Sequence, residues 1–543
     1  MVFARRSTTL LAAIIASCAM VLSLTACTSD NKTVVDGQTT VTSNSAGGVA
    51  VFTPSDGITL NQQMPLNKWA KLVPDLTKAL VDAGFKKGDI NHTTSDSLDK
   101  QSRAIQDFVV DHLSNNTTDD SGIAIAPDNM TLLVAPVVEA DASTRQYGDY
   151  VSQNLSTNDV TDEGATSDGE SSEDDSSKDD SSNTESDSTA SDEQAQAVDR
   201  LVSSLKLAKE SGMHVVLLGN SIEGYKPDAF VKFSDAQTIG KLQAEKMVSK
   251  LKLDKASKDN PKYIEVLLPY TAVDEKGNAN DSTFAQEAFR GIWQVLGSYY
   301  QKGVVESPSG TLDGKSTEND WQAVAYDAAK EGSTAKVLDK RLAKTDGQST
   351  LTRIDGIIMM NDYIASEVVK ELDDLGYTGS AADINPQITI SGIVGNITGK
   401  KDLSRDAVPD PIKSPENDNA NDSSSSDDDA DEDTSASDKD RDSQWPLVTG
   451  YGAYVSNIPS IVNGKQWMTG MEDRQTIATD IAQACAKLNK DEALNSMPSI
   501  RNSEVGGVKK IPTISEPLLA VSASNLKSAL IDPGYISLAD AGL

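Results

Sequence analysis

Hydrophobic and polar residues alternate along this chain in two patterns, which predict amphipathic helices and buried strands. In the stretch 66–83, apolar side chains including Trp69 recur at helical spacing, and Gly84 follows the last turn. The stretch 214–218 is instead almost continuously apolar, which is typical of a strand covered on both faces of a parallel sheet. The two patterns follow one another for most of the chain.

The alternation of the two patterns predicts the fold class. The predicted helices span 66–83, 99–113, 195–211, 236–251, 283–300, 320–342 and 364–375. The predicted strands span 57–60, 131–135, 214–218, 230–233, 263–268, 356–360, 388–390 and 447–449. Buried strands that alternate with helices form parallel sheets with helices on both faces, and here they form two series. We therefore expect an α/β protein of two doubly wound parallel-sheet lobes.

Two acidic inserts interrupt this alternation and explain most of the net charge of −33. The stretch 159–193 holds 14 acidic residues and one lysine, and the stretch 416–442 holds 12 acidic and two basic residues, so together they contribute −13 and −10. Both consist of Ser, Asp and Glu with almost no large apolar residue, so we expect them to stay disordered. They are either solvated loops or a brush that attracts divalent cations. Such an acidic chain is not expected to bind nucleic acid.

The N-terminus has the layout of a secretory signal. Arg5 and Arg6 precede an apolar run, 10–24, that is too short to span a bilayer comfortably. The run is followed by Cys27 in the sequence Leu-Thr-Ala-Cys (24–27), which resembles a bacterial lipobox and implies lipidation of the Cys27 thiol and then cleavage just before it. Acyl chains anchor a protein through roughly 0.8 kcal/mol per buried methylene. An ordinary signal peptide with an incidental cysteine is the alternative.

The remaining cysteines and histidines give no indication of catalysis. Once Cys18 has left with the signal and Cys27 is acylated, Cys485 is the one that remains, so no intramolecular disulfide can form. The stretch 219–224 has some likeness to a nucleophile elbow, but Glu223 stands where its second glycine is required. His214 lies at the start of a predicted strand, away from its carboxyl end. We expect no enzymatic activity, no metal and no cofactor.

Several segments resemble the type I periplasmic sugar-binding proteins of ABC transporters, in particular their xylose and multiple-sugar branch. The similar segments, in chain order, are MPLNKWAKLVPDLTKAL (64–80), VKFSDAQTIGKLQAEKM (231–247), DGIIMMNDYIASEVVKELDDLGY (355–377), LVTGYGAYVSNIPSIVNGKQWMTGMEDRQTIA (447–478) and VKKIPTISEPLLAVSASNLKSALIDPGYI (508–536). The resemblance covers most of 56–536 outside the acidic inserts. It implies two lobes that are joined by three crossing segments and close around one small ligand.

The resemblance also implies a set of sugar-binding residues. The residues carried over from it, together with those that follow predicted strands, are Lys68, Trp69, Asn220, Asp235, Asn361, Asp362 and Trp467. Asn361-Asp362 matches the family pattern well. Gly219-Asn220 replaces the family's Asp-Arg pair, and Gly452 stands where the family has the aspartate of its GQDA motif. Ligands of such sheets bind beyond the carboxyl ends of the strands, so the stretch 269–281 also belongs to the candidate region.

Each of these residues also has a structural alternative. The two tryptophans can stack on a sugar ring or belong to the core. Asp362 can bind a hydroxyl group, cap the helix that follows it, or do both. Asn220 and Asp235 can contact a ligand or stabilise turns.

We therefore expect a membrane-anchored solute-binding component of an ABC importer, which captures a sugar or a related polar molecule without covalent chemistry. Its expected partners are that ligand, an ABC permease and, through the lipid anchor, the extracytoplasmic face of the bacterial membrane, and we expect a monomer. The alternative is a degenerate receptor fold that acts as a surface sensor or interaction protein. The expected segments are a signal peptide (1–26), a flexible tether (27–50), a first lobe (51–234 with 471–507, insert 157–194) and a second lobe (235–470 with 508–543, insert 414–443).

Overall fold

The computed structural model of the protein describes most of the chain after residue 45. The described residues are 46–55, 65–115, 126–138, 146–150, 153–156, 185–273, 280, 282–328, 330, 332–343, 351–381 and 443–543. The chain divides into a short unit, Met1–Asn44, and a compact unit, Ser45–Leu543, to which all of them belong. The predicted signal peptide, Cys27, most of both acidic inserts and the predicted strands 57–60 and 388–390 lie outside the described residues.

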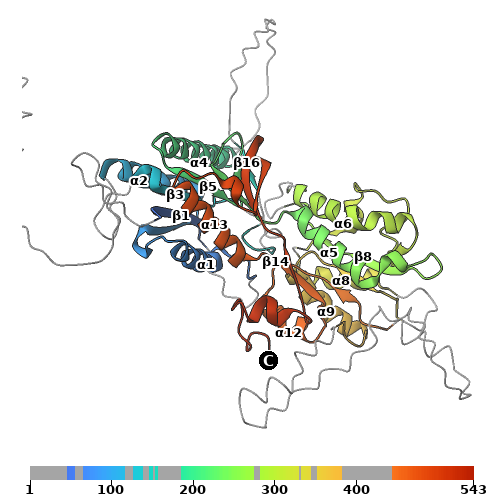
Figure 1. The fold of residues 1–543 in the computed structure, drawn as a ribbon. Coiled ribbons are helices and arrows are strands. Elements are labelled where there is room, and N and C mark those ends of the chain that lie inside the picture. Colours follow the sequence, from blue (N-terminus) through green and yellow to red (C-terminus); the bar gives the residue numbers. More distant parts are fainter. Residues whose placement is uncertain are drawn as a thin grey trace, which may run out of the picture. The chain divides into compact units, whose positions relative to one another are not determined.

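Seven strands form the sheet of the first lobe, in the order β15-β16-β7-β5-β3-β1-β2 (Figure 1). The strands are β1 Gly48–Pro54, β2 Ile90–Ser95, β3 Met130–Val134, β5 His214–Leu218, β7 Ala229–Lys232, β15 Ile500–Val505 and β16 Val508–Ser515. All neighbours from β16 to β2 pair in parallel, and β15 pairs antiparallel with β16. Beside this sheet, β4 (Asn154–Leu155) pairs with β6 (Ser221–Ile222).

Helices cover both faces of this sheet because its inner strands are apolar on both sides. In β1, Val49 and Val51 face one helix layer, whereas Ala50 and Phe52 face the other. The first layer consists of α1 Trp69–Asp82 and α13 Arg474–Leu488, and the second consists of α2 Leu98–Asn115 and α4 Glu185–Glu210. Residues of one continuous apolar run therefore contribute alternately to two separate cores, one on each face of the sheet.

The second lobe contains a four-stranded parallel sheet in the order β10-β8-β12-β13. Its strands are β8 Lys262–Val266, β10 Val305–Glu306, β12 Gly356–Ile358 and β13 Leu447–Val448. Two further strands of two residues each pair in parallel: β9 Leu268–Pro269, which follows β8, and β11 Ala325–Tyr326, which follows α7. The helices of this lobe are α5 Ala236–Leu251, α6 Thr283–Gln301, α7 Trp321–Val324, α8 Ser333–Arg341, α9 Asp362–Leu375 and α12 Ile458–Val462.

Three segments of the chain cross between the lobes. The first joins β7 to α5, the second joins β14 (Met468–Met471) to α13, and the third joins β16 to β17 (Leu519–Ser522). β14 and β17 pair antiparallel, so the second and third crossings run side by side. Two doubly wound lobes with three connections confirm the predicted fold class. Because β16 pairs with β7 in the first sheet, the third crossing lies after Ser515, later than the predicted boundary at residue 507.

Short turns complete the chain. The 3-10 helices are η1 Lys87–Asp89, η2 Pro127–Asn129, η3 Leu253–Lys255, η6 Val455–Asn457 and η7 Leu494–Ser496, and a π-helix, η8, spans Lys527–Ile531. A C-terminal cluster of buried apolar residues, including Leu526 and Leu530, packs around α12.

Several predicted elements need correction. β1 begins at Gly48, within the stretch predicted as a tether, and β2 was not predicted because its side chains are mostly exposed and polar. α4 begins at Glu185, before the predicted residue 195. The predicted helix 320–342 is interrupted: α7 ends at Val324, β11 follows, and α8 starts after Gly332, whose φ of 70° ends one segment and begins another.

Candidate functional site

A pocket lies at the carboxyl end of the strand pair β9–β11 in the second lobe. Its cavity has a volume of about 540 Å³. The lining residues are Tyr270, Ala272, Val273, Trp321, Gln322, Ala325, Tyr326, Asp327 and Lys330. This is the edge of a parallel sheet at which ligands of doubly wound folds bind. The volume suits a small molecule.

Three aromatic side chains form the apolar part of this pocket. The rings of Tyr270 and Trp321 meet edge to face, with centroids 5.2 Å apart and an interplanar angle of 84°. The Tyr326 hydroxyl lies 3.1 Å from the Thr334 hydroxyl, and burial raises the pKa of Tyr326 well above its ordinary value of 10. Val273, half exposed, adds an aliphatic side chain. The pocket lining is therefore partly aromatic, and Trp321 and Tyr326, which are 9% and 8% exposed, also belong to the core of the second lobe.

Polar groups surround these rings. The Asp327 carboxylate accepts a hydrogen bond from the Thr271 hydroxyl at 3.1 Å and lies 3.5 Å from the Lys330 ammonium group. The Asn280 amide donates to the Thr271 carbonyl at 2.8 Å, and the Tyr270 hydroxyl donates to the Asn280 carbonyl at 3.1 Å. Asp327 keeps 42% of its side chain exposed, so its carboxylate remains accessible to a ligand.

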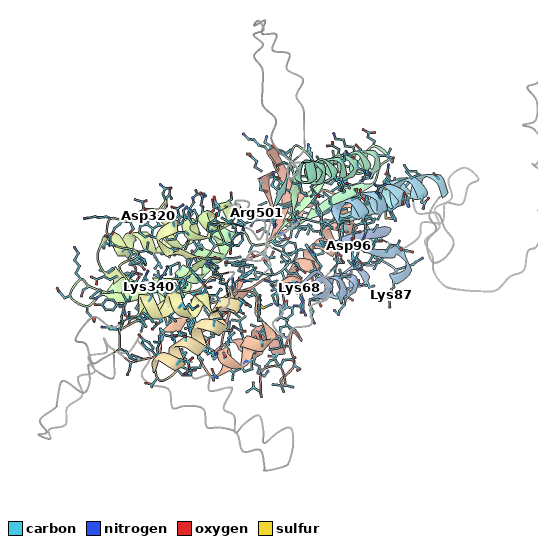
Figure 2. All side chains as sticks on the ribbon, turned by 180° about the vertical axis from the view of Figure 1, so that it is seen from behind. Lys68, Lys87, Asp96, Asp320, Lys340 and Arg501 are labelled. Atoms are coloured by element: carbon cyan, nitrogen blue, oxygen red, sulfur yellow. The ribbon has the colours of Figure 1, made fainter. Side chains whose placement is uncertain are left out.

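Lys68 and Trp69 are committed to contacts within the chain. Figure 2 shows Lys68 at the beginning of α1, where its ammonium group lies 2.9 Å from the Asp149 carboxylate. Asp149 also accepts from the Trp69 backbone N–H at 3.0 Å. The Trp69 ring is 2% exposed and packs edge to face against Tyr150 and Phe233. Of the two roles predicted for Trp69, the structure shows the core role.

The side chains of Asn220 and Asp235 form hydrogen bonds within the chain. The Asn220 side chain accepts from the Gln153 N–H at 3.0 Å and donates to the Pro136 carbonyl at 2.9 Å. Asp235 caps the N-terminus of α5 by accepting from the N–H and hydroxyl of Thr238. Burial raises the pKa of Asp235, but the hydrogen bonds from Thr238 and Lys232 outweigh it, so the pKa lies below its ordinary value.

Asn361 and Asp362 lie together at the end of β12, but they have different roles. Asn361 caps α9 by accepting from the Ile364 N–H at 2.9 Å, and its amide donates to the Gln146 side chain at 3.2 Å. Of the roles considered for Asp362, the capping of α9 belongs instead to Asn361. The backbone carbonyl of Gln146 also accepts from the Tyr454 hydroxyl at 2.7 Å. The Asn361 amide therefore already has a partner in a segment of the first lobe.

Asp362 is the centre of a buried hydrogen-bond network. Its side chain is 0% exposed and accepts from the Gln466 amide at 2.7 Å, the Thr469 hydroxyl at 2.9 Å and the Tyr454 N–H at 2.9 Å. Burial raises the pKa of Asp362 to about 6, although these donors oppose the rise. Both carboxylate oxygens are thus used within the second lobe.

Trp467 belongs to the core of the second lobe. Its side chain is 7% exposed, and its backbone N–H donates to the Val448 carbonyl at 2.8 Å. The predicted site residues are thus dispersed over caps, turns and cores and do not line the pocket. The pocket residues were missed for a clear reason: Trp321 and Tyr326 fell inside a stretch predicted as one helix, whereas Tyr270 fell in the stretch 269–281, which sequence analysis did select.

Neither metal binding nor a membrane span is apparent in the part of the chain that the structure describes. Within that part, His, Cys, Asp and Glu side chains form no group of three that could hold a metal ion. In the same ranges, we find no helix that combines the length and the apolar character needed to cross a bilayer. Cys27, the predicted lipidation site, lies outside the described residues.

Comparisons with known proteins find structural similarity only. No family model and no curated protein sequence matches the chain. A solute-binding protein of an ABC transporter from Clostridium phytofermentans, with bound β-D-glucose, is similar at 17% identity over 91% of this chain and 99% of that one, with a TM-score of 0.44. A carbohydrate transporter solute-binding protein from Chloroflexus aurantiacus, in complex with D-glucose, is similar at 18% identity over 92% and 98%, with a TM-score of 0.43.

A third similar structure is a sugar ABC transporter from Actinomyces odontolyticus. It shares 11% identity over 89% of this chain and 97% of that one, with a TM-score of 0.43.

Proposed function

We propose that the protein is a membrane-anchored solute receptor of an ABC importer that binds a sugar, or a related polar molecule, at the second-lobe pocket. One observation supports the choice of ligand class: Tyr270, Trp321 and Tyr326 supply an aromatic lining, and Asp327 supplies an accessible acceptor beside it. A pyranose has an apolar face that packs on aromatic rings and hydroxyl groups that need matched partners once water is removed.

The remaining parts of this proposal come from the sequence. Lipidation of Cys27 would hold the receptor at the extracytoplasmic face of the membrane, where an ABC permease could contact it. In the cleft that the family resemblance implies, a ligand contacts both lobes and favours the conformation in which they are closest. The second-lobe pocket does not by itself provide such contacts, because all of its lining residues belong to one lobe. No covalent step is needed for this activity.

A binding titration tests the proposal. We expect at least one of D-glucose, D-xylose, D-ribose and L-arabinose to release or absorb heat on titration into the purified protein. The variant Asp327→Ala should bind that sugar about 10-fold to 100-fold more weakly, because a hydrogen bond to a charged group is lost. Asp339→Ala, an exposed residue of α8 outside the pocket lining, is the matched control and should bind as the wild type does.

The alternative function is that of a surface sensor or interaction protein without sugar transport. It is favoured by the internal partners of Lys68 and Asn361, since Asp149 and Gln146 engage the groups that the family resemblance assigns to a sugar. Heat effects from none of the four sugars, or equal affinity of wild type and Asp327→Ala, would support this alternative and overturn the pocket assignment.

A further inference from the structure

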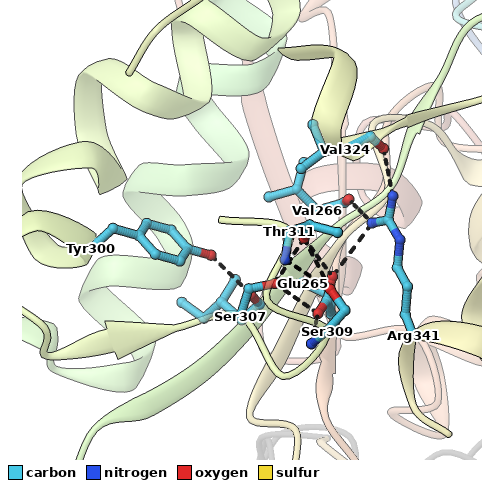
Figure 3. A network of polar contacts seen from close by, with 9 residues as sticks. Glu265, Val266, Tyr300, Ser307, Ser309, Thr311, Val324 and Arg341 are labelled. Atoms are coloured by element: carbon cyan, nitrogen blue, oxygen red, sulfur yellow. Dashed lines mark hydrogen bonds and ion pairs between the residues drawn. The ribbon is translucent and has the colours of Figure 1, made fainter. Parts of the chain in front are cut away.

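Arg341, the last residue of α8, connects two segments of the second lobe that lead into the pocket lining. Its guanidinium group donates to the Val324 carbonyl at 2.9 Å and, through the other terminal nitrogen, to the Val266 carbonyl (Figure 3). The side chain is 8% exposed. A planar guanidinium group can hold two carbonyls in a fixed geometry, which a lysine ammonium group does not reproduce.

These two carbonyls lie next to the segments that hold the aromatic lining. Val266 ends β8 and is followed by β9 and then by Tyr270. Val324 ends α7, which begins with Trp321, and is followed by β11, which contains Tyr326. The strands β9 and β11 have two residues each, so their own pairing holds the two segments together only weakly.

Glu265 orients Arg341 from a buried position. Its carboxylate is 0% exposed and lies 3.4 Å from the Arg341 guanidinium group. It also accepts from the Ser307 hydroxyl at 2.7 Å and the Ser309 N–H at 2.8 Å, both in the loop that follows β10 (Figure 3). A buried ion pair persists only when further hydrogen bonds satisfy both partners, and here they do.

We infer that Arg341, oriented by Glu265, is a positioning residue for the aromatic pocket. By holding the segments after β8 and α7 at a fixed separation, it sets the edge-to-face arrangement of Tyr270 and Trp321 against which the ligand packs. This inference rests on the proposed function of the pocket. Neither residue lines the cavity, so their effect on binding is indirect.

The variant Arg341→Lys tests the inference, with Arg353→Lys as the matched control. Arg353 is a partly buried arginine of the same lobe that lies 3.3 Å from Asp355 and stacks over Tyr263 at 5.4 Å, and neither Asp355 nor Tyr263 lines the pocket. We expect Arg341→Lys to change the near-UV circular dichroism of the ligand-free protein, because a coupled Tyr–Trp pair moves. The four sugars of the binding titration serve as probes, and affinity for the sugar that binds should fall about tenfold.

Arg353→Lys changes the surroundings of the Tyr263 ring, so the two variants are compared by the tryptophan bands of the near-UV spectrum. Arg353→Lys should leave these bands and the affinity unchanged, even at a similar loss of melting temperature. Unchanged tryptophan bands in Arg341→Lys, or equal changes of these bands in both variants, would overturn the inference. If Arg341→Lys does not fold, Glu265→Gln replaces it as the test variant, because glutamine keeps an acceptor for Ser307 and Ser309. Glu265→Gln should change the spectrum in the same way, and an unchanged spectrum would contradict the inference. The near-UV spectrum is measured without ligand. If no sugar binds, the proposed function is refuted, but the spectrum still tests whether Arg341 positions Tyr270 and Trp321.

Discussion

At the scale of single residues, burial raises the pKa of two carboxyl groups, Asp362 and Glu472, and each should make stability depend on pH. Glu472 follows β14 at the second crossing and accepts from the Ser234 N–H at 2.6 Å. The hydroxyls of Ser234 and Tyr451 lie 2.5 Å apart beside it, so residues from three segments meet there. Burial raises the pKa of Glu472 to about 7, and the negative charge of Asp235 adds to the rise.

Glu472→Gln should therefore remove a dependence of stability on pH. Because the folded-state pKa lies above the ordinary 4.5, the contribution of Glu472 to stability is complete below pH 4.5 and is lost as the pH rises toward 7. Relative to the wild type, the variant should gain up to about 3 kcal/mol in free energy of unfolding between pH 4.5 and 8. Urea unfolding at several pH values measures this difference.

The control for this prediction is Glu492→Gln. Glu492 is exposed, and its hydrogen bond with Lys487 lowers its pKa, so its substitution should not produce a gain at high pH. If the free energy of unfolding depends on pH in the same way in the wild type and in Glu472→Gln, the pKa of Glu472 is not raised.

Residue roles were only partly predictable from the sequence. Asp235 and Asn220 were assigned either to a ligand or to turns. A short-range hydrogen bond from Thr238 makes Asp235 a helix cap, whereas Asn220 bonds to Gln153 and Pro136, which are far away in the chain. The roles of Asn361 and Lys68 depend on Gln146 and Asp149, which are far away in the chain. Such non-local partners leave no local pattern in the sequence.

At the scale of elements, α5 and α6 pack closely because each has a glycine at the contact. A Cβ atom on Gly291 would lie 2.0 Å from the Gln237 carbonyl oxygen, and one on Gly240 would lie 2.3 Å from the Ala288 carbonyl oxygen. Both obstacles are backbone atoms, so neither helix can yield without moving as a whole.

Gly291→Ala should destabilise the protein by about 2 kcal/mol, since the cost of overpacking exceeds the helix-propensity gain of about 1 kcal/mol. Thermal or urea unfolding measures the change. Gly314→Ala is the control, because the nearest atom to its added methyl group, the Tyr300 carbonyl oxygen, lies 3.4 Å away. A Gly291→Ala protein as stable as the wild type would mean that the helices are not in close contact.

The elements differ in how well the sequence predicts them, for physical reasons. The bounds of α5 were predicted fully, because Asp235 caps its start and Lys252 ends it in a left-handed conformation. The bounds of β5 were also predicted, because its apolar run is continuous. The break between α7 and α8 was not, because β11 exists only through pairing with the distant β9. The pocket was missed with it.

At the scale of the whole molecule, the proposed receptor consists of two doubly wound lobes with three crossings, and the lipidation expected at Cys27 would anchor it. Cys27→Ser should move the protein from the membrane fraction to the medium, because the thiol that accepts the lipid is gone. Immunoblotting of cell fractions measures the distribution. Retention of the variant in the membrane fraction would contradict the anchor.

The central claim is that a sugar binds at Trp321, and fluorine NMR of 5-fluorotryptophan-labelled protein tests it most directly. The chain has five tryptophans, and Trp321→Phe assigns the resonance of the pocket residue. On addition of the sugar that binds, we predict that the Trp321 resonance shifts with saturating dependence on concentration, while that of the core residue Trp69 moves much less. A binding sugar that leaves the Trp321 resonance in place, or no response from any tryptophan to all four sugars, would contradict the account.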